Sequence, residues 1–156
     1  MNLRTFLFIC INLCVLNLSG QTGRMFTTDK ELSNSNIQCI FQDKEGLIWI
    51  GTEDGLNYYD GGRFKIFKHE ENNKSSLIDN DVRVIFEDSK KHFLIGTLRG
   101  LQEYDCETRQ FKEIPIIGNN KEPVKAHITK IIERKNGEVL VSTSGYGVYS
   151  INWKDN

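Results

Sequence analysis

Residues 37–60 read IQCIFQDKEGLIWIGTEDGLNYYD, and 45 positions later residues 82–105 read VRVIFEDSKKHFLIGTLRGLQEYD. The two stretches share Phe-x-Asp, Ile-Gly-Thr, Gly-Leu and Tyr-Asp at matching places. A third, more divergent copy begins at Ile128 with an offset of 46, and one extra residue precedes its Gly147-Val148 pair. Agreement at so many Gly, Asp, Tyr and Thr positions with a fixed period of about 20 to 50 residues indicates a repeat architecture.

Each copy contains about four short extended runs, rich in β-branched and aromatic residues and separated by turns that contain Gly. In the first copy Ile37, Cys39 and Phe41 alternate with other residues, which is the period of a strand. No segment has helical spacing over the ten or more residues that a helix needs. The sequence therefore predicts an all-β fold, a partial β-propeller of about three four-stranded blades with a period of about 45 residues. The strands expected in the first copy are residues 36–41, 47–52, 56–59 and 64–67.

The second run of each copy is apolar at consecutive positions, 48–50 in the first copy and 93–95 in the second. Such a run predicts a central strand that neighbouring blades cover on both faces. Gly51 and Gly96 follow directly, and we expect a neighbouring backbone or ring to come close to them.

The turns carry the remaining repeated residues. Gly55 and Gly100 are expected to need positive φ. Tyr59 and Tyr104 can bury a ring while the hydroxyl reaches a polar partner, and the Asp that follows each can accept backbone N–H bonds. We predict a structural role, with no ligand contact, for the whole repeat motif, which comprises Asp43, Gly46, Trp49, Gly51, Thr52, Gly55, Tyr59, Asp60, Asp88, Gly96, Thr97, Gly100, Tyr104, Asp105, Gly137, Thr143 and Gly147.

The later copies depart from the first at identifiable positions. Lys91-His92 replaces the Gly-Leu pair of the first hairpin, which leaves the geometry of that turn open. In the third copy Arg134 replaces the repeated Asp, Ser142 replaces Gly, and no Tyr-Asp pair closes the third strand. Natural variation between blades and a decaying sequence both explain these changes.

The first twenty residues resemble a secretory signal peptide. They contain Arg4, an apolar stretch at 6–18 and a Ser-Gly pair at 19–20, and the apolar stretch is shorter than the about 20 residues of a membrane-spanning helix. We expect a periplasmic or secreted product with a lead-in at 21–31, a first blade and linker at 32–76, a second at 77–123 and an incomplete third blade at 124–156. Cys39 and Cys106 are expected to be unpaired thiols, although a bridge between them is possible in an oxidising compartment.

Residues 36–89 and 92–105 resemble consecutive two-component regulator propeller repeats, as in the N-terminal periplasmic sensor region of Bacteroides-type hybrid two-component system histidine kinases. The resemblance implies a parent with many blades, a membrane helix and a histidine kinase, which senses polysaccharide fragments and signals by phosphorelay. The chain holds fewer than three full periods, so we expect a sensor segment truncated before the membrane helix and kinase. Its expected partners are a glycan ligand and either the remaining blades or other copies of itself. The residues that carry the resemblance are Asp43, Gly46, Trp49, Ile50, Gly51, Thr52, Gly55, Leu56, Tyr59, Asp60 and the linker 69–76.

Composition and motifs argue against several other functions. The chain has 20 Lys and Arg against 21 Asp and Glu and no long basic block, which argues against a nucleic-acid binder. No zinc spacing or P-loop is present, and a solvated loop explains the acids Asp79, Asp81, Glu87 and Asp88 better than a calcium site does. We therefore expect no cofactor, no metal, no membrane span after the signal and no catalysis in these 156 residues. Two alternatives remain: a secreted propeller lyase or glycosidase, with inward carboxylates as acid and base, and a self-assembling propeller scaffold.

Overall fold

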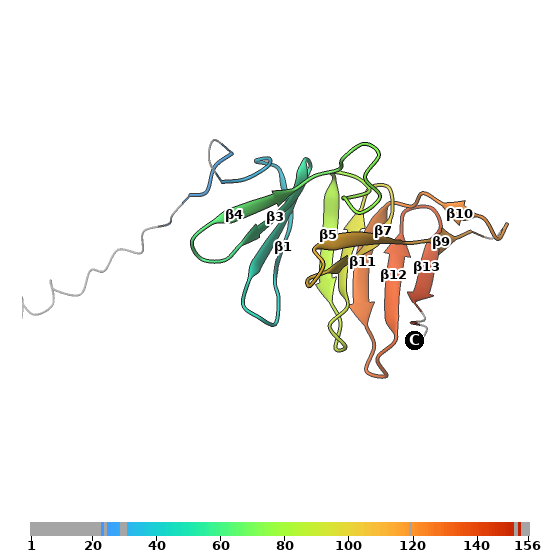
Figure 1. Cartoon of the computed structure of the whole chain (residues 1–156). Helices are drawn as coiled ribbons and strands as arrows, with labels where there is room; N and C mark the ends of the chain where they lie inside the picture. Colours follow the sequence, from blue (N-terminus) through green and yellow to red (C-terminus); the bar gives the residue numbers. More distant parts are fainter. Residues whose placement is uncertain (1–22, 24, 29–30, 119, 152, 154–156) are drawn as a thin grey trace, which may run out of the picture.

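The protein is described by a computed structural model that covers residues 23, 25–28, 31–118, 120–151 and 153. The signal peptide expected at 1–20 lies outside these residues. Within them, every regular element is a strand, and the strands form successive antiparallel sheets along the chain (Figure 1). The described part holds no helix that is long and apolar enough to cross a membrane. The predicted all-β partial propeller is confirmed.

Each sheet is a meander in which strands adjacent in sequence pair with one another. The third sheet has three described strands, and a small hairpin precedes it. The first sheet contains β1 (Ile37–Gln42), β2 (Ile48–Thr52), β3 (Gly55–Tyr59) and β4 (Phe64–Phe67); the second contains β5 (Val82–Glu87), β6 (Phe93–Thr97), β7 (Leu101–Asp105) and β8 (Gln110–Ile114); the hairpin contains β9 (Ile116–Ile117) and β10 (Pro123–Val124); the third contains β11 (Ile128–Glu133), β12 (Val139–Thr143) and β13 (Gly147–Ile151).

The three sheets repeat the same register. The first residue of each first strand pairs with a threonine of the second strand: Ile37 with Thr52, Val82 with Thr97 and Ile128 with Thr143. In each first strand the register shifts directly after this pair. The extra residue of the third copy falls in the loop before Gly147, since Thr143 pairs with Gly147 as Thr52 pairs with Gly55. An insertion in a loop leaves the side chains of both flanking strands on their original faces.

The core lies between the sheets in two clusters. In the first cluster Trp49 and Leu56 of the first sheet pack against Phe93 of the second, and in the second cluster Leu94 packs against Val139 of the third. All five residues of β6 are buried because the second sheet has a neighbour on each face. In β12, by contrast, buried residues alternate with partly exposed ones over the first four positions. Burial of both faces accounts for the consecutive apolar residues of β6.

Gly51 and Gly96 lie where one sheet approaches the first strand of the next. A Cβ at Gly51 would lie 2.7 Å from the carbonyl oxygen of Val82, and a Cβ at Gly96 would lie 2.6 Å from Cγ2 of Ile128. Real Cβ atoms do not approach other heavy atoms this closely. A side chain at either position would therefore push neighbouring sheets apart.

The expectation for Gly100 is wrong. Gly55 has a φ of +135°, but Gly100 is not among the glycines with positive φ. Its turn is instead closed by the Thr97 N–H, which donates to the Gly100 carbonyl at 2.9 Å. A Cβ at Gly100 would lie 3.3 Å from Cδ1 of Ile78, so packing restricts this position more than its torsion does.

The hairpin between the first two strands of each sheet keeps one geometry despite its varied sequence. Gly46 and Gly137 have φ of 87° and 81°, and Lys91 adopts 72° at the same place. Each of the three donates its N–H to the carbonyl three residues earlier, at 3.0, 3.2 and 2.9 Å for Gly46, Lys91 and Gly137. The Lys91-His92 substitution therefore leaves the turn intact, with a strained non-glycine residue in the left-handed region.

Replacing Lys91 with glycine should raise the free energy of unfolding by about 0.5–1 kcal/mol. Glycine removes the cost of the left-handed backbone, and the greater entropy of the unfolded chain offsets only part of that gain. Urea unfolding measures the change. The matched control is Lys90→Gly, one residue earlier and without positive φ, which should be neutral or destabilising. A Lys91→Gly protein less stable than the parent would contradict the strain argument.

Candidate functional site

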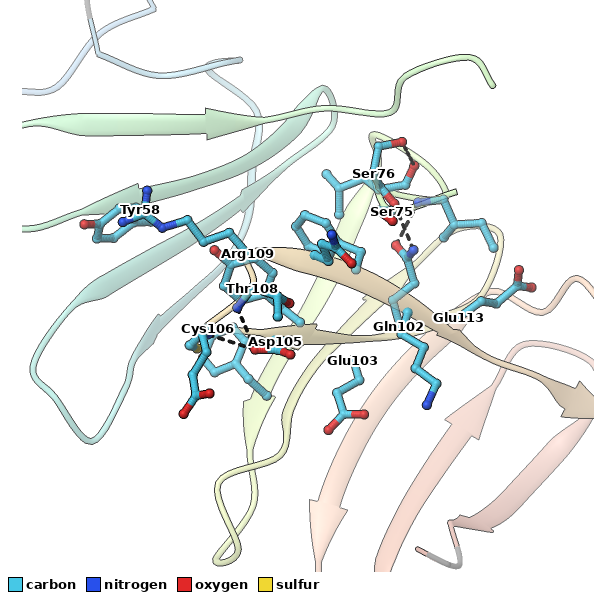
Figure 2. Close-up of a pocket in the computed structure, with 18 of the residues that line it drawn as sticks. Tyr58, Ser75, Ser76, Gln102, Glu103, Asp105, Cys106, Thr108, Arg109 and Glu113 are labelled. Carbon is cyan, nitrogen blue, oxygen red and sulfur yellow. Dashed lines mark hydrogen bonds between the residues drawn. The ribbon is translucent and has the colours of Figure 1, made fainter. Parts of the chain in front are cut away.

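A groove of about 1360 Å³ separates the outer strands of the first and second sheets. Its walls come from β2 to β4, from β7 and β8, and from the linker between the sheets. The first strands of the two sheets are in contact, whereas Figure 1 shows the first sheet standing at an angle to the second. Figure 2 shows Tyr58 on the first sheet and Ser75, Ser76 and Gln102 on the opposite side of the groove.

Aromatic rings form the floor of the groove. The Trp49 ring lies 4.6 Å from that of Phe93, 5.3 Å from Tyr58 and 5.4 Å from Tyr104, measured between centroids. The Trp49 Nε1–H donates to Oδ2 of Asp43 at 2.7 Å. Burial raises the pKa of Tyr104 to about 12, so its hydroxyl stays protonated at neutral pH.

The rim of the groove is charged. Arg109 has a φ of 58°, and its backbone N–H donates to the Asp105 carbonyl at 2.8 Å. The Lys65 ammonium lies 4.8 Å from the centre of the Phe67 ring. Of the charged residues that line the groove, eight are Asp or Glu and five are Lys or Arg. The excess of carboxylates disfavours an anionic ligand.

Asp60 and Asp105 serve the turns that follow the third strands. The Asp105 carboxylate accepts the N–H groups of Glu107 and Thr108 at 2.8 and 3.0 Å, and the Thr108 bond is drawn in Figure 2. The Asp60 carboxylate accepts two N–H groups of its own turn, both at 2.8 Å. These backbone N–H bonds lower the pKa of both carboxyl groups. The hydroxyl of Tyr59 donates to the Gly61 carbonyl at 2.7 Å.

Asp43 and Asp88 hold the first hairpins of their sheets. Oδ1 of each accepts the N–H groups two and four residues ahead, at 3.0 and 2.8 Å for Asp43 and at 2.9 and 2.8 Å for Asp88. Oδ2 of Asp88 bonds to Nδ1 of His92 at 2.7 Å. In the third hairpin Asn136 supplies the side-chain acceptor, and Arg134 forms an ion pair with Glu138 at 2.6 Å.

The repeated threonines close the next turn in the same way in all three sheets. The hydroxyls of Thr52, Thr97 and Thr143 donate to the carbonyl of the glycine that follows the turn, at 2.9, 3.0 and 2.8 Å. The motif residues are therefore spread over hairpins, turns and interfaces between sheets. Those that the structure brings together in the groove are Asp43, Trp49, Tyr104 and Asp105.

Two buried amides, which the repeat pattern did not predict, hold the segments that precede the first and second sheets. Oδ1 of Asn57 accepts the Ser33 N–H at 2.8 Å, and Oε1 of Gln102 accepts the Ile78 N–H at 2.7 Å. Both side chains are almost fully buried in the third strand of their sheets. An amide at the same place in two copies was the signal that could have revealed them. The third sheet has Tyr149 at this place in the register.

The clustered acids have nearby protein partners. Asp81 pairs with Arg83 at 2.6 Å, and this bond raises the pKa of the guanidinium. Glu87 accepts the Lys44 N–H at 3.0 Å, and Asp79 lies 3.9 Å from Arg99. Among the described residues, no three His, Cys, Asp or Glu side chains are placed to hold a metal ion.

Both cysteines of the described chain are free thiols. Cys39 is half-buried beside Gly51, and burial raises its pKa to about 11. Cys106 is exposed at the edge of the groove, and its pKa is also raised. Neither thiol is activated as a nucleophile, because reactive cysteines have a lowered pKa.

Residues 31–54 match the family described as two component regulator propeller. The predicted resemblance to these repeats is confirmed. Over 80 residues the chain is 35% identical to histidine kinase P4 of Formosa agariphila, a match that covers 49% of this chain and 6% of that protein. The chain therefore spans a small part of that relative.

Solved structures from B. thetaiotaomicron share the fold. The extracellular domain of one protein described as a hybrid two-component system has a TM-score of 0.72 and 26% identity, covering 83% of this chain and 18% of that chain. A second extracellular domain with the same description has a TM-score of 0.67 and 25% identity, covering 86% of this chain and 18% of that one. The chain thus spans less than a fifth of either domain.

Proposed function

We propose that this chain is part of the extracytoplasmic ligand-sensing propeller of a hybrid two-component regulator. The observation that carries the proposal is the regulator propeller repeat at 31–54, on sheets that share their fold with extracellular domains of two-component systems. The signal-like residues 1–20 support export of the chain. In this role the segment binds and transmits, and the histidine kinase that responds belongs to another part of the parent protein.

The groove between the first and second sheets is the proposed ligand site, and a polysaccharide fragment is the proposed ligand. Sugar rings have apolar faces that stack on aromatic side chains such as Tyr58, and hydroxyls that bond to amides and charged groups. The rim offers Glu103 and Arg109, whose side chains have no hydrogen bond to the described protein. Because carboxylates predominate along the groove, a neutral oligosaccharide fits better than a uronate or a sulfated sugar.

Isothermal titration calorimetry of the chain against neutral and acidic oligosaccharides tests this function. We expect one neutral class to bind with a Kd between about 1 µM and 1 mM, and Tyr58→Ala or Arg109→Ala to weaken it about tenfold. Lys90→Ala, an exposed change outside the groove, is the matched control and should leave the affinity unchanged. Preferred binding of acidic sugars, or equal affinity in all four proteins, would refute the groove as the site.

The same samples separate binding from catalysis. A sensor returns the oligosaccharide unchanged, whereas a propeller lyase or glycosidase produces shorter sugars or unsaturated ends. Chromatography of the sugars after long incubation is the measurement. Turnover abolished by replacing a groove carboxylate such as Glu103 would favour the enzyme alternative.

A further inference from the structure

The contact between consecutive sheets occurs twice in the described chain, with equivalent positions each time. We call the side of a sheet that faces the next sheet its presenting face, and the side that faces the previous sheet its receiving face. On the presenting faces, four positions of the first sheet correspond to four of the second: Cys39, Trp49, Gly51 and Leu56 correspond to Val84, Leu94, Gly96 and Leu101.

The presenting face of the third sheet breaks this pattern. By register, Lys130 and Ser142 stand at the positions of Cys39 and Gly51, while Leu140 and Val148 keep the apolar positions. Val148 is 66% exposed, whereas its counterparts Leu56 and Leu101 are completely buried. None of the described residues covers this face in the way that the second and third sheets cover the faces before them.

Ser142 changes the shape that this face can accept. At its counterparts, a Cβ would lie 2.6 to 2.8 Å from atoms of Val82 or Ile128, the first residue of the next sheet. Ser142 carries that Cβ, and its hydroxyl is fixed by a 2.7 Å bond to Thr129. Lys130 adds a charged group, and a close apolar neighbour would desolvate it at a cost in free energy. The residue at the Val82 position must therefore be smaller than valine or lie further from this face, because the Ser142 Cβ takes the space that Val82 and its carbonyl fill against Gly51.

The receiving face of the first sheet carries a bulky residue at this position. Ile37 stands at the position of Val82, and it is 40% exposed. Phe26 covers another part of this face, with its ring centre 5.3 Å from Tyr59 and 5.2 Å from Phe64.

Phe67 has the same relation to the second sheet, where its ring centre lies 5.4 Å from Tyr104 and 5.6 Å from Phe111. Phe26 of the lead-in therefore holds, on the first sheet, the place that an aromatic residue of a preceding sheet would take.

A hydrogen bond adds a third requirement. In both existing contacts the first hairpin of one sheet donates an N–H to a glutamate that ends the first strand of the next, from Lys44 to Glu87 at 3.0 Å and from Ser89 to Glu133 at 2.9 Å. In the first hairpin of the third sheet, the N–H at the position of Lys44 and Ser89 belongs to Lys135. On a second copy the corresponding acceptor is the neutral Gln42, which is a weaker partner than a carboxylate.

We infer that the third sheet presents its face to a blade with a small residue at the Val82 position and an acidic residue at the end of its first strand, and that the first sheet of a second copy does not fit there. Ser142 and Lys130 exclude that sheet on one side, and Phe26 covers it on the other. The partner is a different blade. The self-assembling scaffold, in which copies close a ring by repeating the internal contact, is therefore disfavoured.

Sedimentation velocity tests this inference on the full chain. The triple variant Phe26→Ala, Lys130→Val, Ser142→Gly restores the pattern of the second sheet and uncovers the first. We expect the parent to sediment as a monomer and the triple variant to self-associate more than about tenfold more tightly.

The matched control is Lys125→Val, Ser144→Gly, which makes two of the same exchanges at exposed positions outside the strands. It should behave as the parent does, and far-ultraviolet circular dichroism verifies the folding of every variant. A triple variant that associates no more tightly than the parent or the control would overturn the inference. A parent oligomer that Ser142→Arg dissolves would also overturn it, since copies would then already pair through this face.

Discussion

Trp49→Ala should lower the free energy of unfolding by about 3–5 kcal/mol, the range for removing a buried aromatic side chain. The ring lies between two sheets and packs against Phe93 and Tyr104, and its Nε1–H bonds to Asp43. Its loss leaves a cavity at the first interface and an unpaired carboxylate oxygen in the hairpin. Equilibrium unfolding in urea, followed by tyrosine fluorescence and circular dichroism, measures the change.

Trp49→Phe separates packing from hydrogen bonding. It keeps most of the ring contact and loses only the bond to Asp43, so a smaller loss of about 1–2 kcal/mol is expected. Met25→Ala is the control for removing an exposed apolar side chain, since Met25 is 82% exposed, and should be nearly neutral. If Trp49→Ala were as mild as Met25→Ala, the first interface would not be a source of stability.

Gly96→Ala should destabilise the protein by about 1–3 kcal/mol, because the new Cβ overlaps Ile128 at the second interface. Gly51→Ala should cost about as much, but the overlap there includes the carbonyl oxygen of Val82. Thermal and urea unfolding of both variants measure the losses. Gly62→Ala is the matched control, since its nearest contact would be 3.5 Å away and its φ is not positive.

The two interfaces should differ in their response to a second substitution. Trimming Ile128 to alanine removes Cγ2, the atom nearest to the new Cβ, and leaves the Ile128 Cβ 2.8 Å away as part of a side chain that can shift, so Gly96→Ala should do less harm in that background. Trimming Val82 leaves its carbonyl in place, so Gly51→Ala should be only partly relieved. Double-mutant cycles give the two coupling energies. Equal coupling at both sites would refute the assignment of the Gly51 contact to the backbone of Val82.

The fold was predictable because its information is local and repeated. The residues that alternate along β1 and the glycine turns that follow are visible in any one copy, and the observed bounds Ile37–Gln42 differ by one residue from those expected. The shift at Gly147 also emerged from the alignment of copies. Lys91 shows the limit of this reasoning, because its turn keeps the glycine geometry without glycine.

The groove and the linker contacts were not predictable from periodicity. The groove depends on the angle between two sheets, and Phe67 and Tyr104, which meet at that interface, belong to different repeats. The buried amides Asn57 and Gln102 occupy strand positions that binary patterning treats as polar and exposed, yet each contacts a segment far back in the chain. The prediction of positive φ at Gly100 was wrong for a related reason, since the space at that position is limited by Ile78, which precedes the second sheet.

The amides that hold the linkers also affect how the chain folds as it is made. Ser33 precedes Asn57 by 24 residues, and Ile78 precedes Gln102 by the same interval. At a synthesis rate of about 5–20 residues per second, each linker emerges from the ribosome about 1–5 seconds before the amide that secures it. During that time Leu77, which is buried in the finished fold, remains in water. The second sheet therefore passes through a brief stage at which a chaperone can bind the nascent chain.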